Sequence, residues 1–470
     1  MIVFLFWGGT SRNDGGLRGA EELIGSMKLD AESSWMGVYL GGNKVGYIHS
    51  EIAIREDGGY EITEISRMSG AMMGSQQQMK LKMTVTTDST LAMASFEGSL
   101  DAAPYITSFK GFHKEQVLHI ELTAGGKTSS RVIPAPEPIY LSQAIKPLLE
   151  AGRLGANDSL KLSGFDPLSM EMQDLVVIGA EPQLHMLFGE QVQARKLTTR
   201  MSGFESSLFI DEAGNSIAEY GPLGIVLKQE TMESALNVDD GTGTIDFLDL
   251  FAIKPVGTIP ESRSVTRAIY RVNGFPIDRL VAASGRQFAV GGDTIMVDAR
   301  QIRIESEDNF DSATLKDAPF IESRETGILA AAKIAMMNGT SRVDSLERLS
   351  AWVFNSVAKK PSAGIPSALA VLNTRSGDCN EHSVLFTAMA RSVGIPTRIQ
   401  LGAVYQQGRF FYHAWPASLI DNRWVEFEPT FGDLRADAAR LAMAKGDLSA
   451  AGELAAAIGN IKIEILSTEK

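Results

Sequence analysis

Residues 375–383 read RSGDCNEHS, and this stretch predicts a turn that leads into a helix. Asp378 is a favourable N-cap residue, and Glu381, three positions later, completes the spacing of a capping box. The predicted helix therefore begins at Cys379. A thiol at the positive end of a helix dipole is expected to have a lowered pKa and to be primed as a nucleophile. The free backbone N–H groups there could hold an oxyanion, and Asn373, just ahead, is a candidate side-chain donor for it.

Cys379 is the single cysteine of the 470-residue chain. The chain can therefore form no intramolecular disulfide bond and no cysteine-rich metal cage. A lone cysteine is more often a small buried apolar residue than a nucleophile, so its surroundings have to decide between the two interpretations.

A thiol nucleophile needs a base, and His413 is the best placed of the six histidines. It lies in the strand-like run FFYHAW, residues 410–415, which could lie alongside the cysteine helix. A carboxylate should then hold the other ring nitrogen. Glu428, in the run WVEFEPT at residues 424–430, is the natural candidate because a proline ends its predicted strand just after it. Glu426 shares a strand face with Glu428 by the two-residue period and is a second candidate.

With these residues in place, the segment from about Ile328 to Gly432 resembles the core of the transglutaminase-like superfamily, which has a papain-like Cys/His/carboxylate site. The marks of that family are a Gly-x-Cys helix start, a His-Ala-Trp strand and an Asp-Pro-Thr motif after the next strand. The run RSVGIPTR at residues 391–398 also resembles the family's segment between helix and strand. At Glu428 the sequence departs from the family's aspartate, and the extra methylene demands an adjustment of backbone or rotamer. The matching residues are Gly377, Cys379, His413, Ala414, Trp415, Pro429 and Thr430.

The resemblance implies thiol-dependent acyl transfer on the amide bond of a peptide or a Gln side chain, through a thioester. It implies that Cys379 attacks the carbonyl, that His413 protonates the departing amine and that Glu428 holds the imidazole. Asp378 and Trp415 are expected to support the site. Most bacterial members of this type are suspected hydrolases, so a protease or amidase is favoured over deamidation or cross-linking to a Lys amine. The expected partner is a protein or peptide substrate, and no cofactor is implied.

Other interpretations of the same residues stay open. Cys379 could be a packed helix residue, His413 a core histidine and Glu428 a solvated edge charge. Cys379 and His382, three positions apart on one helix, could also join His413 in a zinc site, although no fourth ligand stands out. Because Glu428 replaces the family's aspartate, the domain could instead be a catalytically inert scaffold or binding protein of the cell envelope.

The chain as a whole is predicted to be an α+β multidomain protein. Residues 30–240 read as a succession of short strands and predict a large antiparallel β-rich domain, with a helix at residues 141–149 packed across its sheet. The polar, turn-prone run at residues 239–244 predicts a linker. A small β-module is expected at residues 245–320. Residues 321–470 are expected to form the papain-like α+β transglutaminase-like domain, in which helices precede strands.

The charge and the start of the sequence bear on partners and location. The formal net charge is -13 and no run of Lys and Arg stands out, which disfavours nucleic acid as a partner. The apolar start MIVFLFWGG is too short to span a membrane. Residues 1–29 are interpreted as a leader or as the tail of a truncated membrane anchor, and an ordinary first strand is the competing interpretation. The β-rich region is similar in general character to those of bacterial exported transglutaminase-like proteins. A periplasmic or cell-envelope protein is therefore expected, with membrane anchoring as an option.

Overall fold

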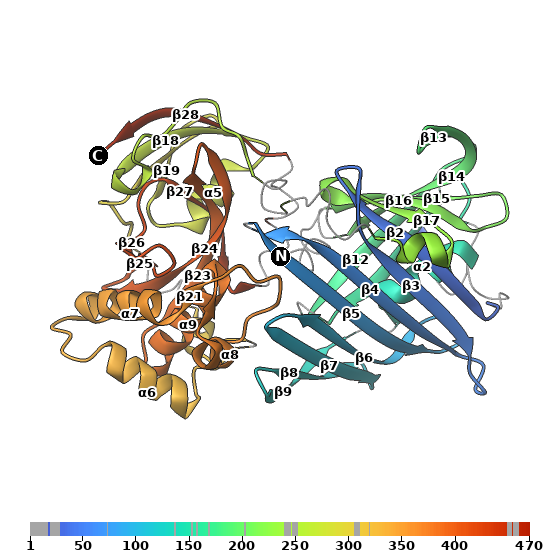
Figure 1. Ribbon diagram of the computed structural model, residues 1–470, viewed down its shortest axis with the longest axis horizontal. Helices are drawn as coiled ribbons and strands as arrows, with labels where there is room; N and C mark the ends of the chain where they lie inside the picture. The colour runs from blue at the N-terminus through green and yellow to red at the C-terminus, as the bar shows by residue number, and fades with distance from the viewer. Residues whose placement is uncertain are drawn as a thin grey trace. The chain divides into compact units, whose positions relative to one another are not determined.

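A computed structural model of the chain divides into two compact units (Figure 1). Unit 1 comprises residues 1–71, 76–123 and 127–245, and unit 2 comprises residues 72–75, 124–126 and 246–470. The predicted leader, apart from residues 17–18 and 29, and the predicted linker at 239–244 lie outside the described residues. The finer four-part division of the chain stays a prediction. The described residues are 17–18, 29–72, 74–135, 138–151, 154–156, 158–167, 170–201, 204–238, 246, 252–304, 311–318, 320–448, 454 and 460–470.

In the described residues of unit 1 the strands form one 17-stranded sheet. The strands lie in chain order from β2 to β9 and from β10 to β17, and β17 pairs with β2, which joins the two runs. The short strands β1 and β10 pair in parallel with β11, whereas the other described ladders of the sheet are antiparallel. The predicted large antiparallel β-rich domain is confirmed. The strands are β1 (Leu17–Arg18), β2 (Glu32–Leu40), β3 (Asn43–Ile54), β4 (Tyr60–Met72), β5 (Ser75–Thr87), β6 (Met93–Ala102), β7 (Tyr105–Lys114), β8 (Val117–Ala124), β9 (Lys127–Pro134), β10 (Ile139–Tyr140), β11 (Ser159–Asp166), β12 (Glu171–Gly179), β13 (Gln183–Leu187), β14 (Glu190–Met201), β15 (Phe204–Ile210), β16 (Ser216–Tyr220) and β17 (Ile225–Gln229).

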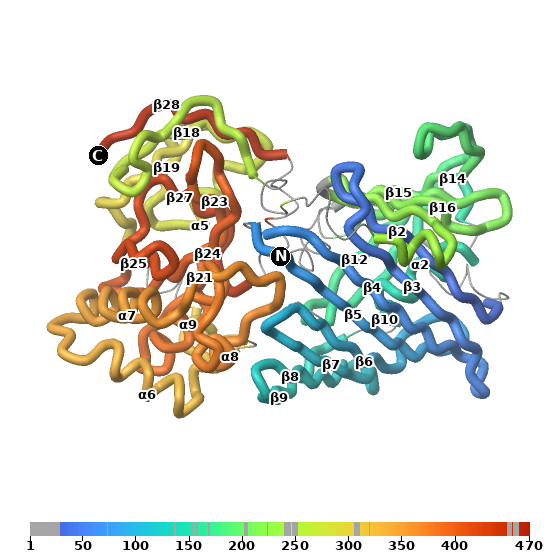
Figure 2. Tube along the Cα trace, viewed as in Figure 1, coloured from blue at the N-terminus to red at the C-terminus, as the bar shows by residue number. Residues whose placement is uncertain are grey.

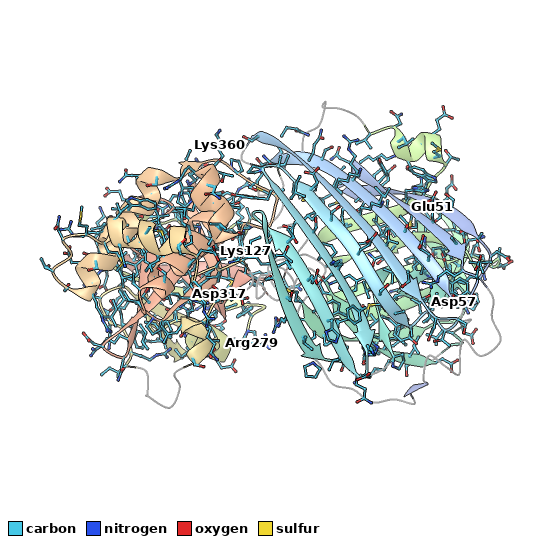
Figure 3. All side chains as sticks on the ribbon, turned by 90° about the horizontal axis from the view of Figure 1, so that it is seen from below. Glu51, Asp57, Lys127, Arg279, Asp317 and Lys360 are labelled. Carbon is cyan, nitrogen blue, oxygen red and sulfur yellow. The ribbon has the colours of Figure 1, made fainter. Side chains whose placement is uncertain are left out.

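Helix α2 (Ser142–Ala151) covers part of one face of this sheet. Its buried residues Ala144, Leu148 and Leu149 pack in one cluster with strand residues such as Leu160. Each fully buried leucine contributes about 1.5–3 kcal/mol of transfer free energy, so this contact is a main part of the core of unit 1. A short helix, α3 (Met232–Leu236), follows the last strand. In Figure 3 the strands near the start of the chain, in blue and cyan, lie in front of the green ones.

The described part of unit 2 combines helices with two small sheets and a two-stranded ladder. One sheet has the order β19-β20-β18-β28, and the other has the order β26-β25-β24-β23-β27. Figure 2 shows α6 to α9 grouped together, and the four-stranded sheet on the opposite side of unit 2. The elements are β18 (Arg267–Asn273), α5 (Ile277–Ala283), β19 (Gln287–Gly291), β20 (Thr294–Asp298), α6 (Thr326–Ala335), α7 (Arg342–Ser356), β21 (Ala358–Lys359), α8 (Ala368–Thr374), β22 (Ser376–Gly377), α9 (Cys379–Ser392), β23 (Thr397–Gln406), β24 (Arg409–Ile420), β25 (Arg423–Glu428), β26 (Asp433–Arg435), β27 (Arg440–Gly446) and β28 (Lys462–Glu469).

Helix α9 lies at the centre of unit 2. It packs against α6, α7 and α8 and against strands β23 and β24, and residues 381–391 are all buried. A helix that is enclosed on all sides carries apolar residues on every face. In α9 the three consecutive residues Val384, Leu385 and Phe386 point in different directions, and all three are apolar and buried. The N-terminus of α9 is thereby held in one position relative to the five-stranded sheet.

The four-stranded and five-stranded sheets of unit 2 are joined by buried hydrogen bonds. The Tyr270 hydroxyl donates to the carbonyl of Ala438 at 2.8 Å. The Gln287 side chain donates to the carbonyl of Ala442 at 2.9 Å and accepts from its N–H at 2.6 Å. Strand β28, from the end of the chain, pairs with β18, so residues far apart in sequence complete the smaller sheet.

Candidate active site

The candidate nucleophile is the first residue of α9. Glu381 accepts a hydrogen bond from the backbone N–H of Asp378 at 2.9 Å, which is one half of the predicted capping box. A side chain at Gly377 would bring its Cβ within 2.1 Å of the Cβ of Glu381, so the glycine leaves room for the cap. Cys379 is half-buried. The predicted start of the helix at this cysteine is confirmed.

The N-terminal turn of α9 is hydrogen-bonded to the residues of β24 on both sides of His413, namely Tyr412 and Ala414. Ser383 donates a hydrogen bond to the carbonyl of Ala414 at 3.0 Å, and the backbone of Ala414 also hydrogen-bonds the sulfur of Cys379. These two helix residues are four positions apart and share one face. On the other side of His413, the Tyr412 hydroxyl donates to the side-chain oxygen of Asn380 at 3.1 Å. The sulfur therefore lies against the residue that follows the candidate base.

The imidazole of His413 is buried and held by Glu428. Its Nε2 lies 2.7 Å from a carboxylate oxygen of Glu428, and both side chains are almost fully buried. An ionised carboxylate can only accept, so Nε2 carries the proton and Nδ1 of the neutral ring is an acceptor. The ring stacks with Trp415, with centroids 5.7 Å apart, and lies tilted against Phe431, with centroids 5.0 Å apart. The structure thus brings two of the three predicted catalytic side chains into direct contact.

Glu428 has a second cationic partner that the sequence interpretation missed, Arg440. The Nε of Arg440 donates to the same carboxylate oxygen at 2.6 Å, and the N–H of Thr430 donates to the other oxygen at 3.1 Å. Burial alone would raise the pKa of Glu428, but attraction to Arg440 and His413 holds that pKa below its ordinary value. Glu428 is therefore an ionised, fully bonded acceptor at neutral pH.

Arg440 is completely buried and also pairs with Asp433 and Asp437. It lies in the run DLRADAAR at residues 433–440, whose charges by themselves are typical of a solvated loop. The sequence contains no local signal that this arginine reaches Glu428, because the contact joins β27 to the end of β25.

The environment of the sulfur differs from the prediction. Burial raises the pKa of the Cys379 thiol well above its ordinary value, and the charges of Asp378 and Glu381 raise it further. The backbone hydrogen bond from Ala414 and the charge of Lys359 act in the opposite direction. The predicted lowering of this pKa by the helix dipole is therefore wrong. Desolvation of the thiolate is the largest cause, and the two carboxylates that form the helix cap add to it.

Glu426 and Trp415 belong to a different buried network. The indole N–H of Trp415 donates to Glu426 at 2.7 Å. Glu426 is also bonded to the side chains of Arg286 and Ser284. Because its carboxylate is occupied in this way, Glu426 does not take the place of Glu428 at His413, and Trp415 contributes ring stacking rather than a hydrogen bond to the site.

Two further residues of the sequence analysis, Asn373 and His382, have other surroundings. Asn373 is exposed in the last turn of α8, and within the described part of the chain no hydrogen bond joins it to Cys379. His382 is buried, and its Nδ1 donates to the backbone carbonyl of Asp378 at 2.7 Å. Burial lowers the pKa of His382, which favours the neutral ring. Among the described residues there is no group of three or more His, Cys, Asp or Glu side chains that could hold a metal ion.

Comparison with known proteins supports the family resemblance of the C-terminal region. Residues 330–429 match the model of the transglutaminase-like superfamily. No curated protein matches the sequence. Within the described residues, no helix is long and apolar enough to cross a membrane.

Two solved structures resemble the chain at low sequence identity. One, from Cytophaga hutchinsonii and provisionally described as a cysteine protease, is 15% identical, with a TM-score of 0.29 over 47% of this chain and 86% of its own. The other is a β-barrel-like protein with a domain of unknown function from Brucella abortus, 11% identical, with a TM-score of 0.34 over 44% of this chain and 97% of its own. Both TM-scores are low, so the assignment of the family rests on the sequence match. The segment that matches the family model, residues 330–429, contains Cys379, His413 and Glu428. The C-terminal part of this chain is therefore a domain of the transglutaminase-like superfamily.

Proposed function

We propose that the C-terminal domain catalyses thiol-dependent acyl transfer on amide bonds, with water as the final acceptor, and thus acts as a protease or amidase on a protein or peptide. The main support is the buried contact of His413 with Glu428, beside a helix-start cysteine fastened to Ala414. The family match and the provisional description of the Cytophaga protein agree with this class of chemistry. The proposed compartment, the periplasm or cell envelope, rests on the sequence resemblance alone.

In the proposed reaction the resting thiol is neutral, because its pKa is raised. As the sulfur of Cys379 attacks the amide carbonyl, the thiol proton passes to Nδ1 of His413, and the carbonyl oxygen becomes an oxyanion near the N-terminus of α9. The imidazolium then returns this proton to the departing amine, which leaves a thioester. A water molecule attacks the thioester while His413 takes its proton, and the thiol is regenerated as the carboxylic acid leaves. Glu428 keeps the tautomer of His413 that this sequence requires.

A second candidate is a catalytically inert binding or scaffold domain. The raised pKa of the thiol favours this alternative, because a nucleophilic cysteine usually has a lowered one. The pairing of Glu428 with Arg440 favours it too, because the arginine offsets the negative charge that would stabilise an imidazolium. In this alternative the thiol titrates at high pH without help from His413.

Replacing Cys379 by Ala tests the proposed function. We expect the wild-type protein to hydrolyse members of a panel of peptide anilides and glutamine amides, and the variant to lose this turnover completely, because the chain has no other thiol. The measurement is the initial rate of amine release at neutral pH. Equal rates in both proteins would contradict the proposal, and an inactive wild type with a folded unit 2 would favour the inert domain.

A further inference from the structure

Lys359 is held beside the segment that leads into the nucleophile. Strand β21 pairs in parallel with β22, which places Lys359 opposite Gly377, two positions before Cys379. The backbone N–H of Lys360 donates to the carbonyl of Gly377 at 2.8 Å and fixes this register. The position of the lysine backbone is therefore tied to that of the cysteine.

The side chain of Lys359 lies over the ring of Phe431, which also contacts the candidate base. Its ammonium lies 4.0 Å from the centroid of the Phe431 ring, and that ring lies 5.0 Å from the ring of His413. A cation over an aromatic face is held there by the ring quadrupole. The charge of Lys359 also acts on the sulfur of Cys379, whose pKa it lowers. The ammonium and the imidazole thus contact the same aromatic ring.

Lys359 differs from the other cations near Phe431 in its partners. Arg440 is buried and pairs with Glu428 and Asp433, and Arg263 lies 3.8 Å from Asp433. Lys359 is exposed, and it has no ion pair within 4.0 Å among the carboxylates that the structure describes. Its ammonium can therefore pair with an anionic group of a substrate that approaches the sulfur.

We propose that Lys359 selects amide substrates that carry a carboxylate close to the bond that is attacked. This inference rests on the proposed acyl-transfer function and names its substrate class. The carboxylate can come from an acidic side chain or from the α-carboxylate of a terminal residue, and both present the same anionic group to the ammonium. Attraction between the two charges would hold the amide carbonyl over the sulfur and favour such substrates over neutral analogues.

Alkylation of Cys379 by three matched reagents tests this selection without the need for turnover. N-iodoacetyl-glutamine amide carries no carboxylate, N-iodoacetyl-glutamine carries only the α-carboxylate, and N-iodoacetyl-glutamate α-amide carries only the side-chain carboxylate. The rate of each anionic reagent is divided by that of the neutral one, so that changes in the thiolate fraction cancel. We expect a ratio of about 3–10 for at least one anionic reagent at low salt, falling as salt screens the charge.

The variants decide whether Lys359 is responsible. Lys359→Gln should bring the ratio close to one, whereas Lys360→Gln, at the exposed neighbour labelled in Figure 3, should leave it unchanged. The reagent with the larger ratio identifies the source of the carboxylate. A ratio in Lys359→Gln equal to that of the wild type overturns the inference, whatever the turnover. A ratio that depends on Lys359 in a protein that hydrolyses no amide leaves the charge selection standing and sinks the proposed function.

Discussion

Replacing Glu428 by Gln is expected to lower kcat/KM for amide hydrolysis by about 10³- to 10⁴-fold. The carboxylate of Glu428 accepts a hydrogen bond from the Nε2–H group of His413, at a distance of 2.7 Å. A glutamine amide can present its NH₂ group to Nε2 instead, which moves the ring proton to Nδ1. That nitrogen could then no longer accept the thiol proton. The measurement is the initial rate on the amides that the wild type hydrolyses.

Glu428→Asp is the matched variant, because it keeps the charge and restores the residue typical of the family. One oxygen of Glu428 is shared by His413 and Arg440, so a side chain shorter by one methylene cannot keep both contacts without a shift of the backbone. We expect a loss of about 10- to 100-fold, smaller than that of the Gln variant. Wild-type rates in a folded Gln variant would show that the carboxylate does not set the tautomer.

Replacing Arg440 by Met is expected to destabilise unit 2 by about 3–5 kcal/mol. The guanidinium is completely buried and pairs with Glu428, Asp433 and Asp437. Its removal leaves buried carboxylates without their main counter-charge, which costs far more than the pair contributes when intact. Urea unfolding followed by tryptophan fluorescence measures the change, since Trp352, Trp415 and Trp424 all lie in unit 2.

Arg435→Met is the control for this variant. Arg435 pairs with Glu347 at 2.8 Å but its side chain is half exposed, so its loss should cost at most about 1 kcal/mol.

The destabilisation caused by Arg440→Met is expected to depend on pH. Because the pKa of Glu428 is depressed in the folded state, its stabilising contribution is present above the ordinary carboxyl range and is lost as the pH falls. The difference between wild type and Arg440→Met should therefore narrow below about pH 4. Equal costs for the two arginine variants would contradict the role of Arg440.

Much of unit 2 follows from local sequence signals. The capping residues Asp378 and Glu381 set the start of α9 at the predicted position, because helix caps depend on residues within one turn. Helices α6 and α7 come before the strands of the five-stranded sheet, in the predicted order of helices and strands. The short helices α5 and α8 were not predicted, because seven residues carry too little periodic pattern.

The candidate site was predictable in its residue types but not in its electrostatics. The two-residue period places Glu426 and Glu428 on one face of β25, and only the pairing of β25 with β24 decides which of them reaches His413. The contact of Arg440 with Glu428 joins strands that the sequence does not show to be neighbours. The pKa of Cys379 depends on burial by the folded unit, which the helix start alone does not reveal.

Trapping the thioester on Cys379 tests the proposed acyl transfer most directly. Rapid acid quenching of the protein with a reactive peptide ester, followed by mass spectrometry, detects the acyl group and the residue that carries it. We expect an acyl adduct on Cys379 in the wild type, and a rate of adduct formation lowered about 10²- to 10⁴-fold in His413→Ala. An adduct that forms at the same rate in both proteins, or on a residue other than Cys379, would contradict it.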